Sequence, residues 1–183
     1  MDRRELMKMI AALTGCAFIA NDALCENDAS WASAGDVDFL DDVAETILPR
    51  TDTPGAKDAA LGQFIAKYSA ACYPPEHIAL LKKGITQIEA RMQAEQGTGF
   101  RAASAEARKS LLVSIDRQAK EHTQRADTTQ GGQPHYFTLM KQLTLYGFFT
   151  SEAGETRVAR YRPVPGKYKG CIPYIKGQTF WAW

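Results

Sequence analysis

Apolar residues recur at every third or fourth position along most of the chain, which is the spacing that gives a helix one buried face. The first segment of this kind has its apolar positions at Phe39, Leu40, Val43, Ile47 and Leu48. We expect a helix here that Asp36 caps and Pro49 terminates, because proline cannot continue a helix. Residues 50–55 combine Thr, Asp, Pro and Gly and predict a turn-rich loop.

The same spacing predicts four further helices. The second stops before Pro74, the third begins there and ends at Gly97, the fourth begins near Ser104, and the fifth covers residues 135–149. Their apolar positions include Leu61, Phe64, Ile65, Tyr68, Ile78, Leu81, Ile85, Ile88, Met92, Leu111, Leu112 and Ile115. The fifth is the most apolar, so we expect it to be central. Because no segment alternates with the period of a strand, the predicted class is all-α, a compact domain of about five helices.

Three stretches interrupt this pattern. Residues 26–35 are rich in Asn, Asp, Ser and Ala and predict a linker, so the helical domain should span residues 36–156. Residues 124–134 are polar and predict a long surface loop. Residues 157–183 contain three prolines and three glycines, which exclude regular helix and predict an extended, irregular tail.

The first 25 residues have the pattern of an export signal, with a basic start and a short apolar run over residues 9–20. Arg3 and Arg4 are similar to the twin-arginine motif, which exports proteins already folded, and this predicts a periplasmic location. The alternative is an amphipathic first helix of a cytosolic protein.

The fate of this signal is open. Residues 13–16 resemble a lipoprotein box in which Cys16 would be lipidated. The alternatives are cleavage near residues 20–25 or a signal retained as an N-terminal helix. A lipidated or retained N-terminus would associate the protein with a membrane.

Composition and motifs exclude several function classes. With 22 Lys and Arg against 21 Asp and Glu, the chain has no overall charge that would favour nucleic acid. The GxGxxG, CxxC, CxxCH, HExxH and GxSxG motifs are absent, so the sequence offers no cofactor cradle, haem attachment, zinc site or nucleophile. His77, His122 and His135 are scattered and lack metal-ligand spacing. We therefore expect no catalytic residue, bound cofactor or metal in this chain.

The tail interleaves aromatic and basic residues and has no acidic residue after Glu155. Burying one aromatic ring removes roughly 150 Å² from water, worth about 4 kcal/mol before other costs. Such rings either fold back onto the helices or bind a partner, and both alternatives stay open. The candidate partner contacts are Tyr161, Pro163, Pro165, Tyr168, Cys171, Tyr174, Phe180, Trp181 and Trp183.

Three blocks of the sequence resemble the hallmark blocks of the gluconate 2-dehydrogenase subunit 3 family. They are residues 45–56 (ETILPRTDTPGA), 148–152 (FFTSE) and 161–174 (YRPVPGKYKGCIPY). The resemblance implies a non-catalytic small subunit that aids export, maturation and stability of a larger one. That large subunit, of the glucose-methanol-choline oxidoreductase type, would bind FAD and oxidise glucose, a glucoside or gluconate, and a cytochrome c subunit could take the electrons.

Two alternatives belong to other function classes: an autonomous periplasmic lipoprotein that binds a ligand among its helices, and a small oxidoreductase in its own right. The cysteines outside the signal region leave a further choice. In an oxidising compartment Cys72 and Cys171 could bridge each other, Cys171 could bridge a cysteine of the large subunit, or both could stay free.

Overall fold

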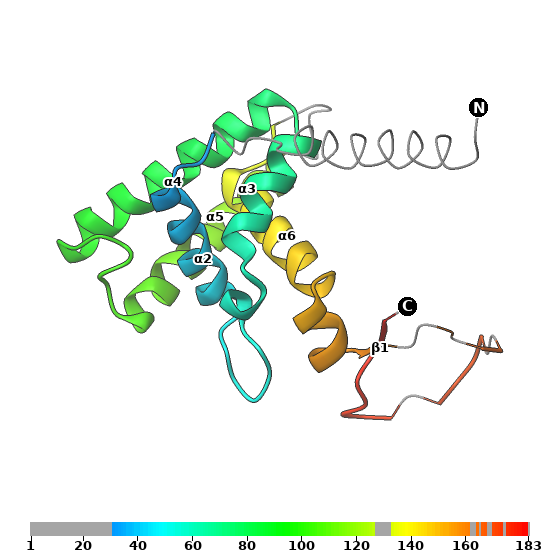
Figure 1. The fold of residues 1–183 in the computed structure, drawn as a ribbon. Coiled ribbons are helices and arrows are strands. Elements are labelled where there is room, and N and C mark those ends of the chain that lie inside the picture. The colour runs from blue at the N-terminus through cyan, green and yellow to red at the C-terminus, as the bar shows by residue number, and fades with distance from the viewer. Residues whose placement is uncertain are drawn as a thin grey trace, which may run out of the picture.

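The computed structural model describes residues 31–126, 133–161, 164, 166–167, 170–173 and 175–182. The helices within these residues are α2 (Ala34–Ile47), α3 (Leu61–Cys72), α4 (Pro75–Gln96), α5 (Ala105–Ala126) and α6 (Tyr136–Phe149). The shorter elements are a 3₁₀ turn, η1 (Ala56–Ala59), a π-helical turn, η2 (Gly154–Val158), and the two-residue strands β1 (Arg160–Tyr161) and β2 (Trp181–Ala182). The predicted all-α class is confirmed (Figure 1).

Helix α6 is central, as its apolar sequence predicted. It contacts α2, α3, α4 and α5, and eight of its residues are buried. Gly84 allows α4 to approach it closely, because a Cβ at this position would lie 2.6 Å from Cδ2 of Tyr136. All five helices bury side chains in the same main core, which contains most of the predicted apolar positions.

The ends of the helices largely follow the sequence signals. Helix α4 has Pro75 in its first turn and ends at Gly97, whose φ of +68° is a left-handed conformation that glycine adopts without strain. Helix α5 begins after Ser104, whose Oγ accepts a hydrogen bond from the backbone N–H of Ala107 at 3.2 Å. None of the described helices combines the length and the apolar content that a membrane crossing requires.

The predicted N-cap of the first helix is wrong by three residues. Ser33, not Asp36, is the N-cap of α2, and Asp36 occupies the third helical position of a capping box. The backbone N–H of Ser33 donates to Oδ2 of Asp36 at 2.9 Å, and the backbone N–H of Asp36 donates to Oγ of Ser33 at 3.2 Å. Trp31 also belongs to the fold, because its Nε1 donates to the carbonyl of Ala66 at 2.9 Å. The end of the predicted linker is therefore structured.

The buried carboxylate of Asp42 joins four parts of the helical domain. This residue of α2 is 7% exposed. Its carboxylate contacts Nζ of Lys57 at 2.6 Å, Nε of Arg101 at 3.0 Å and Nη1 of Arg108 at 3.7 Å. These cations come from η1, the α4–α5 connection and α5, so one anion holds three segments against α2.

Replacing Asp42 with Asn should lower the free energy of unfolding by about 2 kcal/mol, because three cations lose their shared buried anion. Denaturant unfolding followed by circular dichroism measures the change. Asp38→Asn is the matched control, because Asp38 is exposed and, among the described residues, pairs with Arg101 alone, at 3.2 Å; its effect should stay within about 0.5 kcal/mol. Equal effects of the two substitutions would contradict the role given to Asp42.

His135 caps the N-terminus of α6 through its ring. Its Nδ1 accepts a hydrogen bond from the backbone N–H of Phe137 at 3.2 Å, so this nitrogen must be unprotonated. Burial lowers the pKa of His135, and electrostatic interactions with nearby His122 and Arg91 lower the pKa further. The folded protein therefore favours the neutral ring more strongly than the unfolded chain does.

The free energy of unfolding should consequently fall as the pH drops below about 6.5, the ordinary pKa of the ring in the unfolded chain, and should keep falling until the folded-state pKa is reached. His135→Asn keeps a side-chain acceptor at the cap and cannot titrate, so it should remove this component. Denaturant unfolding at a series of pH values tests both statements. If the free energy of unfolding depends on pH in the same way in the variant as in wild type, both statements are wrong.

Candidate partner interface

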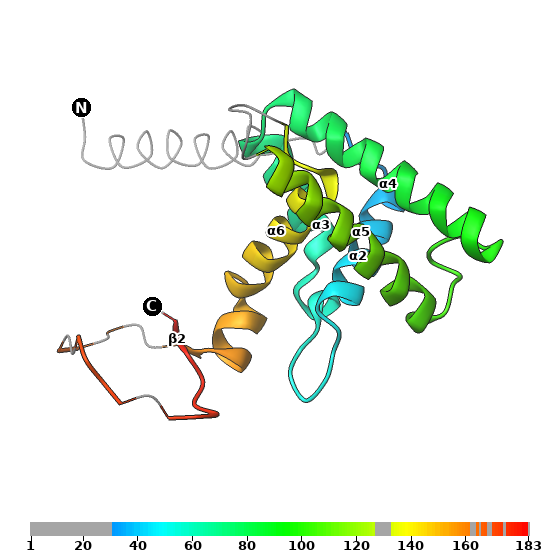
Figure 2. The ribbon, with the colours of Figure 1, turned by 180° about the vertical axis from the view of Figure 1, so that it is seen from behind.

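Three segments that are distant in the sequence meet at one end of the helical domain. A small apolar cluster, which we name the anchor cluster, consists of Ala44, Ala56, Leu61 and Phe148, with Leu48, Ala59 and Val158 packed against it. It joins the ends of α2 and α6 to η1, the start of α3 and η2. Two chain excursions start from this end, one between α2 and η1 and one after η2 (Figures 1 and 2).

The first excursion, residues 49–55, is named here the Glu45 loop, because the Glu45 carboxylate holds its two ends. Oε1 accepts from the backbone N–H of Arg50 and Oε2 from that of Lys57, both at 2.9 Å. Glycine is required at position 55, since a Cβ there would lie 2.6 Å from both Oε1 of Glu45 and the backbone nitrogen of Arg50. The carboxylate thus replaces the hydrogen bonds that a regular element would supply.

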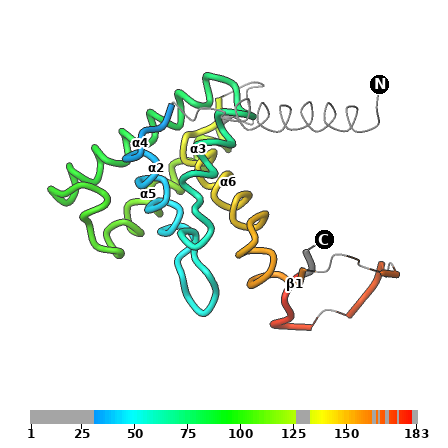
Figure 3. Tube along the Cα trace, in the orientation of Figure 1, coloured from blue at the N-terminus to red at the C-terminus, as the bar shows by residue number. Residues whose placement is uncertain are grey.

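A second carboxylate stabilises the same loop. Asp58 accepts from the backbone N–H of Gly55 at 2.8 Å through Oδ2 and pairs with Nη2 of Arg50 at 2.9 Å through Oδ1. The residues from Pro49 to Thr53 are nevertheless exposed. The loop is therefore organised from its base while its tip projects from the domain (Figure 3).

The chain turns sharply after α6. Oγ of Ser151 donates to the carbonyl of Phe148 at 2.7 Å and accepts from the backbone N–H of Gly154 at 3.1 Å. A Cβ on Gly154 would collide with the backbone of Phe148, so this turn needs glycine. Val158 then packs against the anchor cluster and Ala159 is buried. The start of the tail is thereby fixed to the helical domain.

The tail is irregular, as expected, but its two ends are joined. Strands β1 and β2 pair in parallel, with Arg160 opposite Trp181, and the backbone N–H of Arg160 donates to the carbonyl of Phe180 at 2.8 Å. The ring of Phe180 packs edge-on against Phe149 at the end of α6, with centroids 5.7 Å apart. We name residues 161–180 between these ends the tail loop.

The tail loop exposes apolar side chains. Every residue of it that the structure describes is exposed, including Val164 at 75%, Ile172 at 57% and Ile175 at 61%. The sequence left open whether the aromatic rings of the tail fold back onto the helices or bind a partner. Phe180 folds back, because its ring packs against Phe149 of α6. The apolar side chains further along the loop remain open to a partner.

A row of aromatic rings, named here the aromatic ridge, runs along α3 and α6 beside this end. The ring of Phe64 stacks on that of Tyr68 with their centroids 5.2 Å apart, and the ring centroid of Tyr146 lies 5.3 Å from that of Tyr68. Tyr73 continues the row at 6.1 Å from Tyr68. Burial and the neighbouring Tyr146 raise the pKa of Tyr68, so its hydroxyl stays protonated at neutral pH.

Sequence reasoning missed the ridge because it assigned α6 to the core. Tyr146 is 51% exposed and Phe149 is 40% exposed. The sequence of α6 did contain a sign of these exposed rings. The last turns of the helix have aromatic or aliphatic residues on all faces, which is more than a single buried face requires.

The gluconate 2-dehydrogenase subunit 3 family model matches residues 34–166. The chain belongs to this family. The match starts at the first residue of α2 and covers the first two sequence blocks and the third as far as residue 166, so the resemblance to the family is confirmed. No curated protein and no solved structure matches this subunit 3 chain.

The two cysteines considered for a bridge are exposed free thiols in the structure. Cys72 is the last residue of α3, beside Tyr73 of the aromatic ridge, and Cys171 lies in the tail loop. Neither thiol takes part in a disulfide in the structure, and the internal Cys72–Cys171 bridge stays a prediction. A bridge from Cys171 to a cysteine of another subunit stays a prediction.

The described residues of this subunit 3 chain do not converge on a polar centre of the metal-binding type. No group of three His, Cys, Asp or Glu side chains in that part of the chain could hold a metal ion. A surface pocket of about 390 Å³ between α5 and α6 is lined by Asp116, whose carboxylate binds Lys120 at 2.9 Å and Lys141 at 2.7 Å. These lysines lower the pKa of Asp116, which stays ionised.

The other predicted site residues are placed as follows. Tyr161 and Phe180 lie at the two ends of the tail loop, and Trp181 is described only through its backbone in β2. Outside the described residues lie Arg3, Arg4, Cys16, Pro163, Pro165, Tyr168, Tyr174 and Trp183.

Replacing Glu45 with Ala should leave the backbone N–H groups of Arg50 and Lys57 without their acceptor. We expect faster amide hydrogen exchange at both residues and a loss of about 1–2 kcal/mol in the free energy of unfolding. Hydrogen exchange read by mass spectrometry or NMR tests this. Glu95→Ala is the control, since Glu95 makes only a 3.9 Å pair with Arg91. Unchanged exchange in the Glu45 loop would refute the role of the carboxylate.

Proposed function

We propose that this chain is the non-catalytic small subunit of a periplasmic, FAD-dependent sugar dehydrogenase complex, in which it aids export, maturation and stability of the large flavoprotein subunit. Its membership of a family described as a dehydrogenase subunit supports the assignment to a complex. The observation that carries the proposal is the tail loop, which extends from a fixed base with exposed apolar side chains. A subunit that works only in a complex needs such a surface.

The proposal divides the chemistry between chains. A large subunit of the glucose-methanol-choline type holds FAD and oxidises glucose, a glucoside or gluconate, and a cytochrome c subunit accepts the electrons. The residues of this chain bind and stabilise the large subunit and contact neither the flavin nor the sugar. In this proposal Cys171, an exposed thiol of the tail loop, would bridge a cysteine of that partner.

A shared export signal would explain why the two subunits assemble before export. The twin-arginine route moves folded proteins, so Arg3 and Arg4 on this chain could bring the large subunit to the periplasm with its flavin already bound. The N-terminus, lipidated at Cys16 or retained as a helix, or the assembled complex would then keep the protein at the membrane.

The test is co-expression with the gene of the proposed large subunit. Ile172→Ser combined with Ile175→Ser should reduce co-purified flavoprotein by about tenfold, because two apolar contacts are lost. Deletion of residues 160–183 should abolish co-purification. The readouts are the amount of co-purified large subunit, its flavin absorbance and its dye-linked sugar oxidation. Arg3→Lys combined with Arg4→Lys should stop export of both subunits.

Val113→Ser is the matched control, because Val113 is 61% exposed, as Ile175 is, but lies on α5. It should leave complex yield unchanged. If this chain purifies alone as a stable monomer while the large subunit is exported and active without it, the proposal fails. The ligand-binding lipoprotein would then be the better interpretation.

A further inference from the structure

Charge is divided unevenly between the helical domain and the tail. Six Lys and Arg residues follow Glu155, and no Asp or Glu does. Since the net charge of the whole chain is only +1, the rest of the chain is net negative. The tail therefore differs in sign from the domain that carries it.

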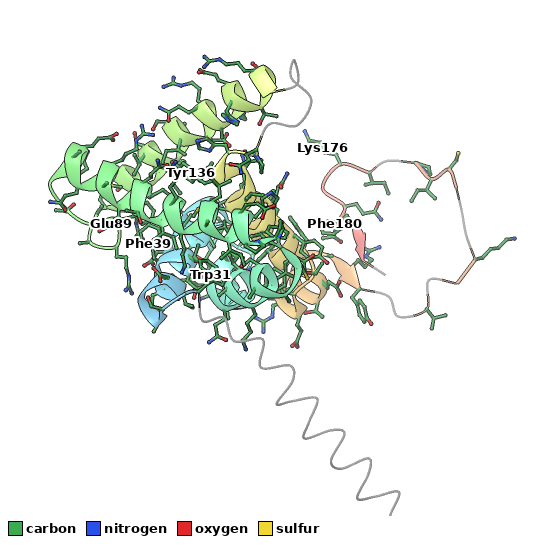
Figure 4. The ribbon with its side chains drawn as sticks, turned by 90° about the horizontal axis from the view of Figure 1, so that it is seen from above. Trp31, Phe39, Glu89, Tyr136, Lys176 and Phe180 are labelled. Carbon is green, nitrogen blue, oxygen red and sulfur yellow. The ribbon has the colours of Figure 1, made fainter. Side chains whose placement is uncertain are left out.

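At two turns of the tail loop, the chain does not pack against the acidic helical domain. Gly166 and Gly177 adopt φ angles of +77° and +82°, and a Cβ on either would meet no atom within 4 Å. Figure 4 shows Phe180 beside the end of α6 and Lys176 further out on the loop. Lys167 and Lys176 are exposed, as are Ile172 and Ile175 between them.

From this arrangement we propose that the tail loop binds, as a preformed closed loop, in an acidic groove with an apolar floor on the large flavoprotein subunit. This inference rests on the proposed function and adds the chemistry of the partner surface. The lysines would pair with carboxylates at the rim, and the isoleucines would enter the apolar floor. The complex should therefore form faster and bind more tightly at low salt.

Closure of the loop suits this role. The pairing of β1 with β2 and the contact of Phe180 with Phe149 bring the two ends together before binding. A closed loop has fewer conformations to lose than an open tail, so more of the contact energy remains as affinity.

A basic and apolar loop could also bind an anionic lipid surface. The charge division favours a protein groove instead. A membrane surface is broad and would repel the net-negative helical domain while attracting the tail, whereas a groove contacts the tail loop alone.

The decisive experiment measures affinity of the full-length chain for the flavin-loaded large subunit at NaCl concentrations from about 0.05 to about 0.5 M. Wild-type affinity should weaken about tenfold over this range. Lys167→Glu combined with Lys176→Glu should weaken it about tenfold at low salt and remove most of the salt dependence. Lys82→Glu with Lys83→Glu makes the same charge change at exposed positions of α4 and should stay within about twofold of wild type.

Circular dichroism would verify that both double variants fold. If wild type binds with no salt dependence and the tail double variant binds equally well, the acidic groove is disproved while the accessory role stands. If wild type does not bind the large subunit at any salt concentration, the proposed function itself fails, and this inference with it. Binding to phosphatidylcholine–phosphatidylglycerol vesicles that the tail double variant loses, with the complex unaffected, would assign the loop to a membrane and overturn the inference.

Discussion

One buried carboxylate ties the α2 side of the helical domain together, because Asp42 is the point where segments from four parts of the chain contact the same group. An anion on the inner side of α2 needs compensation, and Lys57, Arg101 and Arg108 supply it from η1, the α4–α5 connection and α5. The compensation is uneven, since the Nε of Arg108 is buried without a hydrogen-bond partner. The Phe100 ring, 6.0 Å from its guanidinium, offsets part of that cost. Apolar burial is non-directional, whereas an ion pair requires its partners to lie within a few ångströms of the carboxylate, so the pairs of Asp42 restrict where η1 and the start of α5 can lie against α2.

That fixed geometry determines where the exposed segments lie. Lys57 belongs to η1, which also carries Ala56 into the anchor cluster, so the ion pair of α2 and the base of the Glu45 loop are mechanically continuous. Phe148 and Val158 bring the end of α6 and the start of the tail to the same cluster. The helical domain thus acts as a scaffold for two loops that have no core of their own, which is the usual relation between rigid elements and binding loops.

The helices were predictable because local signals determine them. Pro74 and Pro75 stop one helix and start the next, Gly97 ends α4, and Ser104 precedes α5, and each acts within one turn of its own position. The closure of the tail was not predictable, because the β1–β2 pair is two residues long and joins positions 160 and 181, too short for any periodic pattern. The role of Glu45 in holding its loop was not predictable either. Its hydrogen-bond partners are backbone N–H groups, which every residue type except proline offers. Asp36 was misassigned because Ser33 and Asp36 are both good caps, and only the fold decides which one lies outside the helix.

An exposed apolar loop is ordinarily a liability, since it can associate with other copies of itself. The composition of the tail loop limits this risk. Lysines are interspersed with the isoleucines, and two tail loops of the same sign repel each other, while the parallel pair at the base uses hydrogen-bonding groups of β1 and β2 that would otherwise invite another strand. The same lysines that prevent self-association favour an acidic partner. In the proposed complex, the loop would stay apart from other copies of itself until it met a surface of opposite charge, and this combination is what a docking segment requires.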